Sequence, residues 1–173
     1  MIVIVLNGIQ IVTNKNENIF TYPMGVSTAS PETLKLVNQA KKDLYIDMID
    51  TEITKIVSVD LDKDGKQEEI VIVNTLRDEW NYVLADNGAC TFMLIIDDNN
   101  YKVIFKEVVY EDQIDGVNAE MYTSDVIVSD INYNGKPELC ISGGVWDIPI
   151  YSILEYDDMT KDFETVLYGE FAW

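Results

Sequence analysis

Short apolar runs separated by polar turns dominate the hydropathy pattern of this chain. The runs are rich in β-branched and aromatic residues, and the segments between them are rich in Asp, Asn and Gly, a combination typical of antiparallel β-strands joined by tight turns. The first two runs, residues 1–6 and 9–13, flank Asn7-Gly8, a dipeptide that tolerates the positive φ angles of a type I′ turn. They predict an N-terminal β-hairpin.

One segment has the periodicity of a helix. Ser30 is a favourable N-cap residue, and Pro31 suits the first helical position. Four apolar residues then recur at spacings that place them on one side of a helix, namely Leu34, Val37, Ala40 and Leu44. We expect this single short helix to cover an edge or a face of a β-sheet.

Two acidic loops share one pattern, in which oxygen-bearing side chains occupy positions one, three, five and nine and Gly occupies position six. In such a loop alternate side chains converge on one point, the Gly permits a sharp turn, and the backbone carbonyl at position seven offers a further oxygen. This is the design of a site for a hard cation, Ca²⁺ above all. The predicted ligands are Asp60, Asp62, Asp64, Lys66 (carbonyl) and Glu68 in the first loop, and Asp130, Asn132, Asn134, Lys136 (carbonyl) and Glu138 in the second.

The two loops differ from an EF-hand in the same way. Position twelve is Val71 or Ile141 where an EF-hand needs a bidentate Glu, and strand-like runs replace the flanking helices. With Glu at position nine just before a strand, both loops resemble the strand–loop–strand calcium sites of FG-GAP/VCBS repeats, which occur in integrin α-chain propellers and bacterial surface proteins. The resemblance implies an extracellular or surface-associated module for adhesion, assembly, or recognition of a protein or glycan. A pair of turns that need no metal is the alternative.

The two predicted sites differ in charge. The first loop offers four carboxylates, whereas the second offers the carboxylates of Asp130 and Glu138 and the amides of Asn132 and Asn134. Because ligand charge helps to set calcium affinity, we expect the first site to bind calcium more tightly.

The sequence around the loops repeats, since Asp60 and Asp130 are 70 positions apart. Each unit reads as a strand, an acidic loop, a strand, a connection that contains Trp80 or Trp146, and a two-stranded hairpin. We therefore predict a mainly β fold of antiparallel strands in two propeller-blade-like units, residues 53–115 and 119–173, after the hairpin and helix of residues 1–52. A closed propeller needs at least four blades, so the units are expected to pack as a sandwich or a partial propeller within one domain, residues 1–173.

The net charge of the chain argues against some classes of binding partner. The chain has 31 acidic and 12 basic residues and a net charge of −19, which argues against binding to nucleic acids or anionic membranes. Calcium would neutralise part of this charge, and the folded state should then depend on the ion. The alternative function is that of an acidic intracellular inhibitor or immunity protein, which would bind a basic partner without metal.

The remaining features favour a non-catalytic protein that is not inserted in a membrane and that could be part of an oligomer or larger assembly. The chain contains no His, which removes the usual general base and the commonest zinc ligand. No apolar run approaches the roughly 20 residues that span a bilayer, and no basic residue precedes residues 1–6 as in a signal peptide. Cys90 and Cys140 lie in or beside predicted strands, as buried thiols or as a disulfide between the units.

Overall fold

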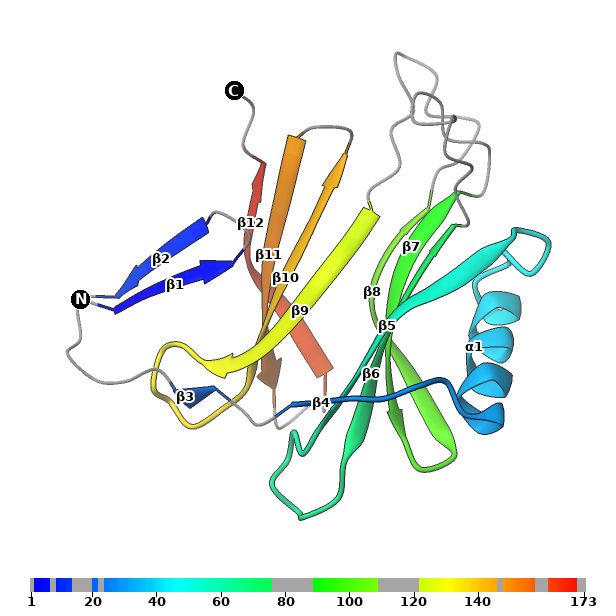
Figure 1. Ribbon diagram of the computed structural model, residues 1–173, viewed down its shortest axis with the longest axis horizontal. Helices are drawn as coiled ribbons and strands as arrows, with labels where there is room; N and C mark the ends of the chain where they lie inside the picture. The colour runs from blue at the N-terminus through cyan, green and yellow to red at the C-terminus, as the bar shows by residue number, and fades with distance from the viewer. Residues whose placement is uncertain are drawn as a thin grey trace.

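The computed structural model describes residues 2–6, 9–13, 20–21, 24–75, 89–108, 122–145, 148–157 and 162–170. The fold is mainly β, with antiparallel strands and one helix (Figure 1). The elements are β1 (Ile2–Leu6), β2 (Ile9–Thr13), β3 (Phe20–Thr21), β4 (Gly25–Val26), α1 (Pro31–Asp43), β5 (Thr51–Val59), β6 (Glu68–Thr75), β7 (Cys90–Asp97), β8 (Asn100–Val108), β9 (Tyr122–Asp130), β10 (Glu138–Val145), β11 (Ile148–Asp157) and β12 (Asp162–Glu170).

Each predicted unit forms one antiparallel meander of four long strands, which confirms the two blade-like units. Strands β5 to β8 follow one another in the first sheet, and β9 to β12 do so in the second. A two-residue edge strand pairs with the first long strand of each sheet, β4 with β5 and β3 with β9. Since β3 and β4 are neighbours in the chain, this part of the N-terminal region pairs with both sheets.

The two sheets face each other across a shared apolar core, and the described strands do not close into a barrel (Figure 1). From the first sheet, Ile70, Ile72 and Met93 contribute side chains that are fully buried. The second sheet contributes Val126, Val128, Leu139, Ile141, Leu154 and Phe163. Complete burial of one such large side chain stabilises the fold by about 1.5–3 kcal/mol, so this core is a main source of the attraction between the sheets.

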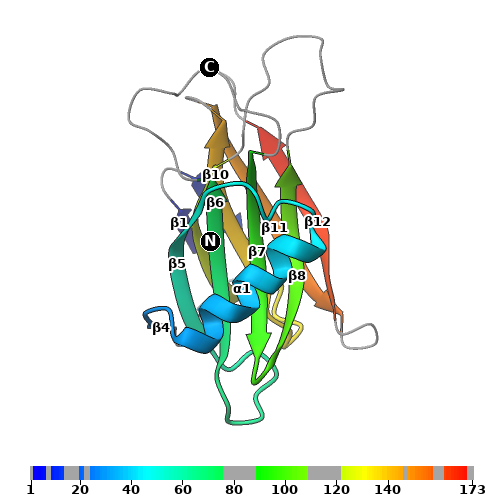
Figure 2. The same ribbon diagram turned by 90° about the vertical axis from the view of Figure 1, so that its right-hand side faces the viewer.

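Helix α1 covers the opposite face of the first sheet (Figure 2). Its residues Leu36, Val37 and Ala40 pack in one cluster with Val71, Val73, Phe92 and Leu94. Because successive residues of a strand point to opposite faces, β6 and β7 need apolar residues at every position when both faces are covered. This explains the unbroken apolar sequences of residues 70–73 and 92–96.

Helix α1 starts at the predicted residue, but the face that it buries against the sheet differs from the predicted one. Ser30 is the N-cap, and its Oγ accepts a hydrogen bond from the Thr33 backbone N–H at 3.0 Å. The prediction that Leu34 faces the sheet is wrong, because Leu34 is 47% exposed. Thr33 is buried in its place, since its hydroxyl donates to Glu69 Oε2 at 2.8 Å and so needs no water.

The predicted N-terminal hairpin is present, with β1 and β2 paired from Ile2–Thr13 to Leu6–Ile9. Its turn residues Asn7 and Gly8 lie outside the described residues, as do Trp80, Trp146 and the junction between the two units. No disulfide joins Cys90 and Cys140, which are both buried.

An ion pair joins corresponding residues of the two units. Lys55 Nζ of β5 contacts Asp125 Oδ1 of β9, with side chains 29% and 34% exposed. The two residues are 70 positions apart, the same spacing that separates Asp60 from Asp130. The ion pair therefore joins corresponding positions of the first long strand of each unit.

Candidate metal centre

The two acidic loops lie side by side at one end of the molecule. The first joins β5 to β6 and the second joins β9 to β10, and both turn at the same end of the sheets (Figure 1). Lys63 Nζ of the first loop donates a hydrogen bond to the Gly135 carbonyl of the second at 3.3 Å. The packing of the sheets thus brings together two loops that are distant in the sequence.

The Asp at position one closes each loop with the same hydrogen bond. Asp60 Oδ2 accepts from the Gly65 N–H at 3.0 Å, and Asp130 Oδ2 accepts from the Gly135 N–H at 2.9 Å. In both residues one carboxylate oxygen is used by the loop, and the other, Oδ1, is left for another partner.

The Glu at position nine ties the end of each loop to its beginning. Glu68 Oε2 accepts from the Leu61 N–H at 2.7 Å, and Glu138 Oε2 accepts from the Ile131 N–H at 2.6 Å. Both Glu side chains are turned inward, with Glu68 8% exposed and Glu138 2% exposed. The two loops therefore hold their acidic ends together in the same way.

Positions three and five repeat the correspondence. In each loop their side-chain oxygens accept from the backbone N–H two residues later, at distances between 2.7 and 3.1 Å. Such Asx turns keep alternate side chains on the inner side of a tight loop. The acceptor–donor pairs are Asp62–Asp64 and Asp64–Lys66 in the first loop, and Asn132–Asn134 and Asn134–Lys136 in the second.

The backbone angles confirm that the loops share one conformation. At position four Lys63 and Tyr133 both have φ of 62°, and at position six Gly65 and Gly135 have φ of 92° and 86°. The sequence pattern predicted Gly where the chain turns sharply. It did not predict the left-handed residue at position four.

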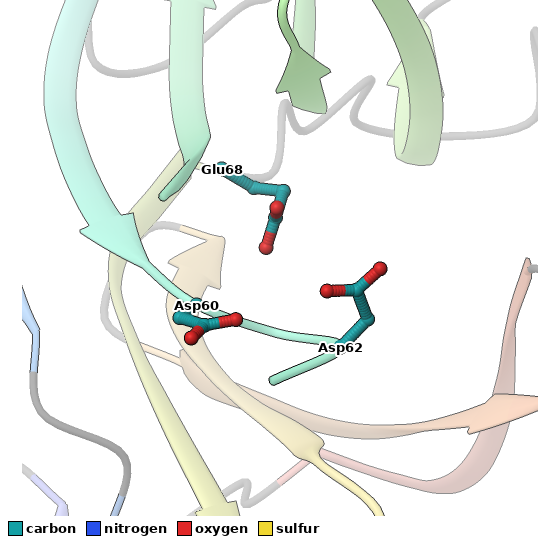
Figure 3. A group of neighbouring side chains, drawn as sticks. All are labelled: Asp60, Asp62 and Glu68. Carbon is teal, nitrogen blue, oxygen red and sulfur yellow. The ribbon is translucent and has the colours of Figure 1, made fainter. Parts of the chain in front are cut away.

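The first loop gathers three carboxylates. Asp60, Asp62 and Glu68 each offer one oxygen, and these oxygens lie within 4.8 Å of one another (Figure 3). Asp64, a predicted ligand, is not a member of this group. Burial raises the pKa of Glu68, and the charges of Asp62 and Asp97 add to the rise, as expected where carboxylates lie close together.

The second loop is more deeply buried. Asp130 is 9% exposed and Glu138 is 2% exposed. Burial raises the pKa of Glu138 to about 7, the hydrogen bond from the Ile131 N–H opposes this shift, and the charges of Asp130 and Glu155 add to it. A carboxylate in this position needs a cation or a proton.

Three buried carboxylate oxygens of the loops, Asp60 Oδ1, Asp130 Oδ1 and Glu138 Oε1, have no hydrogen-bond partner among the described residues. A buried polar atom left in this way costs about 1–3 kcal/mol, and more when it is charged. The orphaned oxygens belong to predicted ligands, at position one of both loops and position nine of the second. All predicted ligands are oxygens, which suits Ca²⁺ and not the nitrogen and sulfur preference of zinc, so the residues fit the predicted ion. The carbonyls of Lys66 and Lys136 stay predictions as ligands.

Glu155 of β11 belongs to the second loop's surroundings, although the sequence pattern did not indicate it. It lies opposite Glu138 in the pairing of β10 with β11. Asn132 Nδ2 donates to Glu155 Oε2 at 3.1 Å, and Asn134 Nδ2 donates to Glu155 Oε1 at 3.2 Å. Only the strand register places Glu155 here, so a pattern confined to the loop could not reveal it.

The fold and the site together define a mainly β protein with two equivalent, oxygen-lined loops at one end. Comparison of this chain with protein-family models, curated proteins and solved structures gives no match. Among the described residues, no helix combines the length and the apolar character needed to cross a membrane.

Proposed function

We propose that this protein is a non-catalytic calcium-binding module in which one structural Ca²⁺ occupies each acidic loop. The observation that carries the proposal is the set of orphaned buried oxygens of Asp60, Asp130 and Glu138. A turn that needs no metal can keep its carboxylates solvated, whereas these loops bury three carboxylate oxygens that have no hydrogen-bond donor among the described residues. A divalent cation would satisfy these oxygens and offset their mutual repulsion.

The proposed ions act on stability. Binding to the folded state alone stabilises a protein by about 2.7 kcal/mol for each site when the ligand is at 100 times its Kd. With a net charge of −19, two ions would also reduce the overall repulsion. The contact between Lys63 and Gly135 means that ordering one loop would help to order the other.

We further propose that the module works outside the cell. Extracellular calcium modules have Kd values of about 10⁻⁴–10⁻³ M and fill at the calcium levels found there. The resemblance of the loops to FG-GAP/VCBS repeats supports a role in adhesion, assembly, or recognition of a protein or glycan. This part of the proposal rests on analogy with the repeats.

The test is a thermal melt of chelator-stripped protein, with calcium and with magnesium. Calcium at 100 times its Kd is expected to raise the Tm by about 10–20 °C when both sites fill, because two sites contribute about 5.4 kcal/mol and 1 kcal/mol corresponds to about 2–4 °C in a domain of this size. Asp60→Asn and Asp130→Asn, which keep the side-chain shape, should each remove part of the rise. The exposed Asp47→Asn is the matched control.

An unchanged Tm at millimolar calcium would contradict the proposal. The acidic inhibitor would then be the function to pursue. Its expected signature is equal stability with chelator or calcium, and binding to a basic partner that weakens steeply with salt.

A further inference from the structure

We propose that Glu155 is a positioning residue of the second calcium site, which fixes the amides of Asn132 and Asn134 with their oxygens toward the ion. This inference rests on the proposed function. It assigns a role to a residue on a strand that does not adjoin the loop, 17 positions beyond Glu138.

Hydrogen bonds hold both the NH₂ group and the oxygen of each side-chain amide. Glu155 Oε2 and Oε1 accept from the Nδ2 groups of Asn132 and Asn134 at 3.1 and 3.2 Å. On the other side, the Oδ1 atoms of the same amides accept from backbone N–H groups at 2.9 and 2.8 Å. Each amide is therefore held with its NH₂ group toward β11 and its oxygen toward the loop.

An Asn ligand needs such an arrangement, but an Asp ligand does not. A carboxylate presents an oxygen in either rotation, so Asp62 and Asp64 in the first loop require no orienting partner. An amide rotated by half a turn would present a hydrogen-bond donor, which cannot coordinate a cation. The second loop has amides at both positions, and Glu155 supplies one acceptor oxygen for each.

Glu155 is itself fixed by the fold. The register of β10 and β11 pairs it with Glu138, and the register of β11 and β12 pairs it with Glu164. Residues opposite each other in neighbouring strands share one face of the sheet, so the three Glu residues form a row. Glu155 is the member of this row next to the ligand Glu138, and Glu164 is one strand further away and exposed.

The experiment is a calcium titration followed by ¹H–¹⁵N NMR, with one reporter for each site. The Gly65 and Gly135 N–H groups donate to the ligands Asp60 and Asp130, so their signals report separately on the first and second loops. Loss of an outer residue that orients a metal ligand typically costs 10–100-fold in affinity. We expect Glu155→Gln to weaken calcium binding at Gly135 by about tenfold, with the Gly65 titration unchanged.

Two controls separate positioning from charge and from folding. Glu164→Gln removes the same charge from the next place in the row and should leave both titrations unchanged. An unchanged Gly65 titration in Glu155→Gln shows that the protein remains folded.

Repeating the substitution in a second variant distinguishes the positioning of the amides from a direct effect of Glu155 on the ion. In the double variant Asn132→Asp, Asn134→Asp, the side chains cannot donate to Glu155, so adding Glu155→Gln should leave calcium binding at Gly135 equal or tighter. An equal loss in both backgrounds would mean that Glu155 acts as a direct ligand or as a general charge, and would overturn the inference. The inference would also be overturned if the calcium titration at Gly135 in Glu155→Gln equalled that of the wild-type protein. If calcium shifts neither the Gly65 nor the Gly135 signal in the wild-type protein, the proposed function itself is wrong, whatever the role of Glu155.

Discussion

The side-chain amide of Asn74 forms with Thr123 the two hydrogen bonds that a neighbouring strand would form. Asn74 Nδ2 donates to the Thr123 carbonyl at 3.0 Å, and the Thr123 N–H donates to Asn74 Oδ1 at 3.1 Å. Both residues are fully buried, and they belong to β6 and β9. One side chain thus links the first sheet to the backbone of the second.

Asn74→Ala is expected to lower the free energy of unfolding by about 2–4 kcal/mol, because it leaves the buried N–H and carbonyl of Thr123 without these partners. Urea unfolding of metal-free protein measures the change. The exposed Asn38→Ala on α1 is the control. A loss no larger than that of Asn38→Ala would show that water or a shift of β9 replaces the two bonds.

Gly65→Ala and Gly135→Ala should each destabilise the protein by about 1–2 kcal/mol, the cost of a left-handed backbone for a residue with a side chain. Their φ angles are 92° and 86°, and an added Cβ would meet no atom within 4 Å, so the cost is conformational and not steric. Because the two φ angles are similar, the two variants should lose similar amounts of free energy of unfolding, as measured by chemical denaturation.

Gly25→Ala is the matched control for these two variants. Its Cβ would lie 3.8 Å from Ser58 Cβ, an ordinary contact, and its φ is outside the left-handed region. Comparable losses at all three glycines would mean that backbone conformation is not the cause.

The stability of the metal-free protein should fall as the pH rises from about 4.5 to about 7. Burial raises the pKa of Glu138 from 4.5 to about 7, so in this range the folded state holds a proton that the unfolded chain has released. Stability decreases with pH wherever the folded state binds more protons, and the loss persists above the folded-state pKa.

Glu138→Gln should therefore stabilise the metal-free protein at pH 8 by about 1–3 kcal/mol and flatten the pH dependence, measured by urea unfolding across the range. The same variant should lose calcium binding at Gly135, since Glu138 is a proposed ligand. If Glu138→Gln changes stability no more than Glu164→Gln, the buried carboxyl is not the source of the pH dependence.

Cys90 and Cys140 should react with a thiol reagent only after unfolding. Their exposed fractions are 0% and 1%, and burial, with a contribution from the charge of Glu138, raises the pKa of Cys140 to about 12. We expect two thiols per chain in denaturant without prior reduction. Detection of fewer would indicate a disulfide, which the structure does not contain between these two residues.

The parts of the fold that depend on local sequence were predicted well. The Asn-Gly hairpin, the Ser30 cap, and the strand–loop–strand units each follow from residues that are neighbours in the chain. The acidic loops belong to the same group, because their hydrogen bonds join residues only two to seven positions apart.

The parts that depend on packing could not be predicted. Asn74 follows the apolar run of residues 70–73 and has its hydrogen-bond partner 49 positions away, and Glu155 reaches the second loop only through the register of β10 and β11. The orientation of α1 was mispredicted for a related reason: Thr33 is buried because Glu69, on a distant strand, accepts a hydrogen bond from its hydroxyl.

The pair formed by Lys55 and Asp125 has a consequence for how the two repeats recognise each other. Because they occupy corresponding positions in the two units, two copies of the same unit in this arrangement would bring lysine against lysine or aspartate against aspartate. Like charges at such a contact oppose association. The two units are therefore complementary at this position, which favours packing of the first unit on the second over packing of two identical units.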